Sequence, residues 1–116
     1  MNTWIWLLAA LAASSATALH AAESMNGRWA ADPSFCAGVG LTPAQAPLVV
    51  TNEALRWSGE ICRVGRSYRT GDTLHLEALC WDKAGRHTIP VSLRLSGNRI
   101  FVVWNRAPRG ELRRCP

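Results

Sequence analysis

The chain has 116 residues, a formal net charge of +5 at pH 7 and four cysteines. This length is enough for one domain and excludes a second, and a domain so short buries only about 60–65% of its unfolded surface, so its apolar core is small. The surplus of positive charge favours anionic partners, and every basic residue except Lys83 is an arginine.

The chain begins with an apolar run at residues 4–13. A run of this length covers about half of a bilayer, since roughly 20 apolar residues are needed to cross the hydrocarbon core. It is typical of a signal peptide, although no Lys or Arg precedes it, and the alternative is a buried N-terminal helix of the domain. Small-x-small patterns at residues 16–18 and 19–21 predict cleavage before Leu19 or before Ala22.

The second cleavage site is favoured because the composition changes from Glu23 onward. We therefore expect a signal peptide over residues 1–21 and a single exported domain over residues 22–116, located in the periplasm or secreted. No cysteine closely follows the apolar run, so we expect neither a lipid anchor nor membrane insertion after cleavage.

The first half of the expected domain combines a long loop with one short hairpin. Residues 32–46 predict the loop, in which Thr42 and Pro43 favour a single helical turn as its cap and first position. Residues 47–51 and 54–57 predict two short strands around a turn at residues 52–53.

A longer hairpin is predicted over residues 61–81, with its turn at Thr70-Gly71-Asp72. Centring the turn on Gly71 pairs Tyr68 with Leu74, Val64 with Ala78, and Cys62 with Cys80. Directly opposed residues bring their Cβ atoms within about 4.5–5.5 Å, which a disulfide can close.

The cysteines therefore predict the pairing Cys62–Cys80, which leaves Cys36–Cys115. Four cysteines allow three pairings, and an even count is typical of the disulfide framework of a small exported domain. A zinc site is disfavoured because its cysteine ligands usually come in close pairs, which this sequence lacks.

The last hairpin has the clearest pattern, with strict alternation over residues 91–96, then Gly97-Asn98, then residues 99–104. We expect positive φ at both turn positions. The register pairs six apolar residues on one face, namely Leu95 with Ile100, Leu93 with Val102, and Val91 with Trp104. Phe101 and Val103 fall on the opposite, nominally solvated face.

Between the long hairpins, residues 82–86 predict a turn, and Pro90 predicts an edge or a bulge in the strand over residues 87–96. Taken together, these patterns predict an all-β domain of seven or eight strands in an antiparallel meander, either a barrel or a sandwich. Trp29, Trp57 and Trp104 are expected in its core.

The expected domain opens with Gly27-Arg28-Trp29, and Cys36 follows shortly after. A Gly-x-Trp pattern entering the first strand resembles the start of calycin-type barrels, and with the nearby cysteine it is similar to small secreted bacterial inhibitors of metalloproteases. The resemblance implies a β-barrel. In those inhibitors the segment before the barrel enters the protease active site, which implies that residues 22–26 form an inhibitory end here.

Catalytic chemistry is not predicted. The longer hairpin brings Ser67, His75 and Glu77 to one face, but the solvated side of a hairpin often groups polar residues in this way without forming a triad. The sequence has no nucleophile elbow, no phosphate-binding glycine loop and no preferred pair of carboxylates. We therefore expect no enzymatic activity, no cofactor and no metal.

A set of arginines and apolar residues is expected on the solvent side of the two long hairpins. Its members are Arg63, Arg69, Trp81, Arg94, Arg99, Phe101 and Val103. Aromatic residues and arginines dominate interface hot spots, so this set predicts a partner-binding face. The alternatives are an ordinary solvated basic face and, for the arginine excess, a codon usage that favours Arg over Lys.

These patterns predict a non-enzymatic binding domain, inhibitor-like or adaptor-like, whose partner is a protein in the envelope or the medium. The alternative is an arginine-mediated binder of anionic envelope polymers such as lipopolysaccharide, acidic glycan or nucleic acid. The two differ in salt dependence, because contacts to many phosphates weaken steeply as ionic strength rises.

Overall fold

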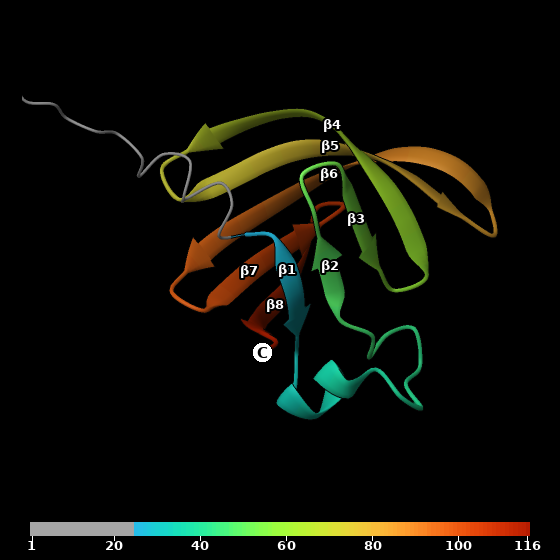
Figure 1. Ribbon diagram of the computed structural model, residues 1–116. Helices are drawn as coiled ribbons and strands as arrows, with labels where there is room; N and C mark the ends of the chain where they lie inside the picture. Colours follow the sequence, from blue (N-terminus) through green and yellow to red (C-terminus); the bar gives the residue numbers. More distant parts are fainter. Residues whose placement is uncertain (1–24) are drawn as a thin grey trace, which may run out of the picture.

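A computed structural model describes residues 25–116, so the expected signal peptide over residues 1–21 lies outside the described residues. Eight antiparallel strands follow one another in a closed barrel in which each strand pairs with its neighbours in sequence and β8 pairs with β1. Figure 1 shows the longest strands, β4 to β6, curving across one side of the barrel. The strands are β1 (Gly27–Ala30), β2 (Leu48–Val50), β3 (Ala54–Trp57), β4 (Glu60–Thr70), β5 (Thr73–Asp82), β6 (Gly85–Ser96), β7 (Arg99–Trp104) and β8 (Ala107–Arg114).

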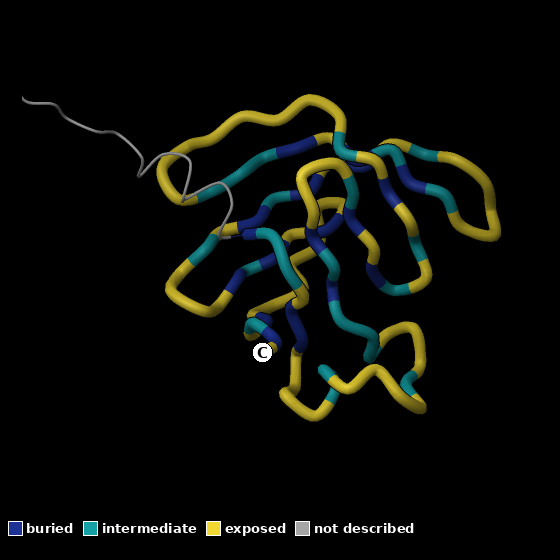
Figure 2. Tube along the Cα trace, viewed as in Figure 1, coloured by how far each residue is buried: buried dark blue, intermediate teal, exposed yellow. Residues whose placement is uncertain are grey.

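The predicted all-β meander is therefore confirmed as a barrel. Successive side chains of a strand point to opposite faces, so alternate residues fill the interior. Figure 2 shows this as short buried segments along the strands, whereas the hairpin ends and the half of β4 next to the β4–β5 turn are exposed. The three tryptophans expected in the core, Trp29, Trp57 and Trp104, are all buried.

The tight turns explain where the strands end. The turn between β6 and β7 was expected to need positive φ at Gly97 and Asn98, but positive φ occurs at Gly97 alone. This is the pattern of a type II′ turn, which needs glycine only at its first central position, so the expectation for Asn98 is wrong. The predicted register of this hairpin is nevertheless confirmed at all three apolar pairs.

The β4–β5 hairpin has two registers separated by a bulge. Cys62 lies opposite Cys80 and Val64 opposite Ala78, as predicted. Between Val64 and Ser67 the register shifts by one residue, because β4 carries an extra residue there. The predicted partner of Tyr68, Leu74, is wrong because the turn consists of Gly71 and Asp72, with Thr70 opposite Thr73, and is not centred on Gly71; Tyr68 lies opposite His75.

Pro90 does not interrupt β6, which runs unbroken past it. The pairing of β6 with β7 begins only at Val91 and Trp104, so on that side Pro90 lies beyond the β7 ladder. Proline has no N–H and is tolerated where no neighbouring strand needs one. The expectation of a local edge holds, and no register shift occurs at Pro90 between β5 and β6.

The loop between β1 and β2 contains a 3₁₀ helix, η1 (Pro33–Ala37), in addition to the predicted turn. Asp32 caps η1, and hydrogen bonds from the Ser34 backbone N–H and from the Ser34 hydroxyl lower the pKa of its carboxyl. The turn at Thr42 is confirmed by hydrogen bonds from the backbone N–H groups of Gln45 and Ala46 to its carbonyl oxygen.

Both predicted disulfides are present. Cys62–Cys80 joins neighbouring strands inside the barrel, and both residues are buried. Cys36–Cys115 ties η1 to the C-terminal end of the chain beside β1, where the Cys115 N–H donates to the Arg28 carbonyl oxygen at 2.8 Å. Two disulfides are typical of proteins that fold in an oxidising compartment.

The disulfides should differ in what they contribute to stability. Their sequence separations are 79 residues for Cys36–Cys115 and 18 for Cys62–Cys80. In the loop-entropy model, Cys36→Ala/Cys115→Ala should lower the free energy of unfolding by about 4.5 kcal/mol and Cys62→Ala/Cys80→Ala by about 3 kcal/mol. Urea denaturation of the two double variants measures both values, and a loss below about 1 kcal/mol for the first pair would contradict the model.

Candidate functional site

The outer face of β4 to β7 carries side chains in rows that follow the strand register. One row runs from Tyr68 to His75, Ser92 and Val103 on successive strands. Directly opposed residues on neighbouring strands project to the same face and contact one another. The register therefore assembles this row from four consecutive strands.

The first row holds its aromatic rings in place. The rings of Tyr68 and His75 stack with centroids 4.8 Å apart and an interplanar angle of 17°. The His75 ring lies between two hydroxyl groups, with Nε2 2.8 Å from Thr70 Oγ1 and Nδ1 3.2 Å from Ser92 Oγ. Tyr68 remains 64% exposed, so a large ring faces solvent in a fixed position.

The adjacent row carries an arginine on an aromatic ring. The guanidinium carbon of Arg94 lies 4.2 Å from the centroid of Phe101, which is opposite it on β7. Val103 is exposed on the same face, one alternate position further along β7. We call Tyr68, His75, Arg94, Phe101 and Val103 together the aromatic–arginine face.

A hollow adjoins this face beside the first row. It has a volume of about 380 Å³ and is lined by Arg66, Tyr68, His75, Leu76, Glu77, Pro90, Val91 and Ser92. Its walls combine one cation and one carboxylate with apolar and aromatic surface. A hollow of this kind can hold a protruding side chain of a partner more closely than a flat surface can.

The structure brings together four of the seven residues predicted for a binding face. Arg94, Phe101 and Val103 belong to the aromatic–arginine face, and Arg99 lies at its rim, where its Nε is 3.4 Å from Glu111 Oε1. Arg63 and Trp81 lie at the other end of the β4–β5 hairpin, where Trp81 is opposite Ile61.

Arg69 is separated from the predicted set by the bulge in β4. It was expected on the same face as Arg63, but it lies opposite Leu74, whose side chain packs on the core. Arg69 instead lines the mouth of the barrel, a pocket of about 330 Å³ with Met25, Leu55 and Leu76 among its walls. The extra residue in β4 reverses which face each later side chain occupies.

The same bulge prevents the grouping of Ser67, His75 and Glu77. Ser67 lies opposite Leu76 and lines the barrel mouth, whereas His75 is on the outer face. The expected pairing of Ser67 with His75 is therefore wrong. The His75 ring nitrogens approach the hydroxyl groups of Thr70 and Ser92 instead.

The predicted set omitted two residues of this face: His75, which was placed with the polar residues instead, and Tyr68. An uninterrupted register places it on the inner side with Leu74, and only the bulge turns it outward. Gly65 was the available signal, because glycine inside a strand often marks a bulge. A Cβ added at Gly65 would lie 3.2 Å from the Glu77 carbonyl oxygen, so this position favours a residue without a side chain.

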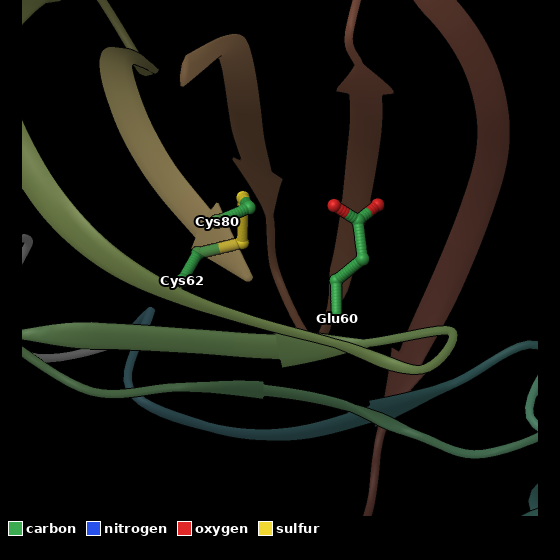
Figure 3. Close-up of side chains that lie close together, drawn as sticks. All are labelled: Glu60, Cys62 and Cys80. Atoms are coloured by element: carbon green, nitrogen blue, oxygen red, sulfur yellow. A yellow bond between two sulfur atoms is a disulfide. The ribbon is translucent and has the colours of Figure 1, made fainter. Parts of the chain in front are cut away.

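A second place of chemical interest is the inner side of the β4–β5 pair at its other end. Figure 3 shows Glu60 next to the Cys62–Cys80 disulfide, with its carboxylate on the same side of the sheet as the sulfur atoms. Because the two sulfurs are bonded to each other, they are not thiolate ligands for a metal. Glu60 also lies close to Asp82 and His87.

In comparisons with known proteins, no family model, no curated protein and no solved structure matches the chain. Within residues 25–116, no helix has the length and apolar character needed to cross a membrane.

The aromatic–arginine face should contribute little to folding. Tyr68→Ala and Phe101→Ala remove partly exposed side chains, so each should change the free energy of unfolding by no more than about 1 kcal/mol. Ile100→Ala, next to Phe101 but fully buried, should cost about 2–5 kcal/mol because it leaves a cavity. Urea denaturation of the three variants tests this contrast, and equal losses at positions 100 and 101 would contradict it.

Proposed function

We propose that this chain is a non-enzymatic binding domain that acts on another protein through the aromatic–arginine face. The observation that carries the proposal is the fixed, exposed stacking of Tyr68 on His75 beside that of Arg94 on Phe101. Aromatic residues and arginines supply most of the binding energy in protein interfaces. Side chains that are already ordered also lose less conformational entropy on binding.

The charges on this face favour a protein over an anionic polymer. Arg94 lies on the Phe101 ring, and Arg99 approaches Glu111. Guanidinium groups that are engaged in this way are less available to neutralise a row of phosphates, which a nucleic-acid or lipopolysaccharide binder requires. The apolar surface of Val103 and Phe101 is better suited to a protein partner.

An inhibitor-like mode of action is the more specific form of this proposal. The up-and-down barrel with eight strands is an architecture that lipocalins also have, in line with the resemblance of the Gly27-Arg28-Trp29 segment to calycins. Met25 is buried. Asn26 donates a hydrogen bond from its side-chain amide to Asn52 Oδ1, and its carbonyl oxygen accepts one from Arg114 Nη1. A segment that enters a protease active site would then consist of residues 22–24, with Met25 and Asn26 as its anchor.

We place this activity in the periplasm or outside the cell, since both disulfides need an oxidising compartment to form and persist. The partner is then a protein of the envelope or the medium.

Affinity capture with a matched pair of variants tests the proposal. The protein, its Tyr68→Ser/Phe101→Ser variant and an Ile61→Ser control are immobilised and exposed to envelope and culture extracts at low and high salt. Ile61 is 53% exposed on β4 but lies away from the aromatic–arginine face. We expect one protein to be retained through high salt by the native chain and the control, and at least about tenfold less by the double variant.

Retention that does not depend on Tyr68 and Phe101 would remove the aromatic–arginine face from the proposal. Retention of an anionic polymer alone, released by salt, would favour the arginine-mediated alternative.

A further inference from the structure

A group of metal-ligating side chains lies at the opposite end of β4 to β6 from the aromatic–arginine face. Glu60 begins β4, Asp82 ends β5, and His87 lies near the start of β6. The pairs Cys62–Cys80 and Cys80–His87 show that alternate residues of these strands face the barrel interior. Glu60, Asp82 and His87 continue this alternation, and ligand atoms of the three residues lie within 4.8 Å of one another.

The core of the barrel orients the Glu60 carboxylate. Trp104, a buried core residue, donates its Nε1–H to Glu60 Oε1 at 3.3 Å. The other oxygen, Oε2, lies 2.9 Å from His87 Nε2. The Glu60 side chain is only 18% exposed. A hydrogen bond to one oxygen of a carboxylate fixes the direction of the other, as is common for metal ligands.

Asp82 supplies a second carboxylate beside this pair. One of its oxygens accepts a hydrogen bond from the Ala84 backbone N–H at 2.7 Å. Asp82 is exposed at the end of its strand, so its side chain can rotate toward Glu60 and His87 without disturbing the core. Its second oxygen is available for such a contact.

The charge balance at this end also favours a cation. The protein has a net charge of +5, yet the ion pair that the structure gives Glu60 is with His87 and not with an arginine. Arg99, in turn, pairs with Glu111. Arg109, on β8, directs its guanidinium onto the Trp57 ring, 5.2 Å from the centroid.

We propose that Glu60, Asp82 and His87 bind a divalent transition-metal ion of the zinc class. Imidazole nitrogens and carboxylate oxygens bind Zn²⁺ at about 2.0–2.2 Å, which places the ligand atoms of a tetrahedral site about 3.3–3.6 Å apart. To reach this spacing around an ion, the ligand atoms of Glu60 and His87, which lie 2.9 Å apart, separate by about 0.5 Å, and the Asp82 carboxylate moves inward by about 1 Å. The absence of close cysteine pairs argues only against a thiolate site and leaves this donor set unaffected.

Such an ion would join the ends of three adjacent strands beneath Trp104. Three protein ligands leave one tetrahedral position for water or for a group from another molecule. The site is independent of the proposed function, because none of its ligands belongs to the aromatic–arginine face.

Metal titration tests this proposal. The chelator-treated protein is titrated with Zn²⁺ by calorimetry and with Co²⁺ by visible absorption, together with Asp82→Asn, His87→Gln and the control His75→Gln. We expect one ion per chain for the native protein and for His75→Gln, and at least about tenfold weaker binding for Asp82→Asn and His87→Gln. Zn²⁺ should also raise the unfolding temperature of the native protein but not of Asp82→Asn, since a ligand that binds only the folded state stabilises it.

Asp82→Asn keeps the test decisive if His87→Gln fails to fold, because Asp82 is exposed at a strand end. Equal affinity of the native protein, Asp82→Asn and His75→Gln would overturn the proposal, as would the lack of saturable Zn²⁺ binding to the native protein.

Discussion

The barrel depends on the burial of Trp29 at the seam where the first strand meets the last. Trp29 is 0% exposed, its Nε1–H donates to the Met25 carbonyl oxygen at 3.0 Å, and the Arg114 guanidinium covers its ring at 4.2 Å. Gly27 makes room for this arrangement, since its φ is +141° and an added Cβ would lie 3.1 Å from Arg114 Nη1. The ladder between β1 and β8 is short, so side-chain packing must hold the seam closed. Without it, the sheet would expose two unpaired edges.

The closed barrel has an outer face and an interior, and the sequence alone does not tell which residues of β4 lie on each. Before the bulge, Arg63 points outward and Val64 inward, whereas after it Tyr68 points outward and Arg69 lines the barrel mouth. The bulge thus supplies an exposed aromatic ring to one side of the sheet and a cation to the other. Bulges commonly re-aim side chains near functional sites, and here one extra residue changes both the outer face and the pocket.

The parts of the fold that followed from the sequence were those with strict alternation or a strong turn signal. The pairs of the β6–β7 hairpin and the core position of Trp104 depend on local patterns that tertiary structure did not override. The predicted pairing of Cys62 with Cys80 is correct, but it depends on the bulge in β4, which the prediction did not include. The register near the turn was wrong because the turn was centred on Gly71 although it consists of Gly71 and Asp72, and the extra residue of the bulge restores the predicted pairs from Val64 to Cys62. The last strand, β8, was not identified because Leu112 is its single buried apolar residue before Cys115. The cluster of Glu60, Asp82 and His87 was not identified either, since three strands must be aligned before these residues come together.

The position of the Cys62–Cys80 bond inside the barrel restricts the order of oxidation events. Thiol–disulfide exchange requires a thiolate to approach a sulfur atom directly, and both cysteines are almost completely buried once β1 and β8 have met. We therefore expect this bond to form while the β4–β5 hairpin is still open to solvent, before the seam closes. Cys36 is half-buried on a surface loop and Cys115 is 8% exposed, so we expect a reductant to reach their bond through Cys36 before it reaches Cys62–Cys80.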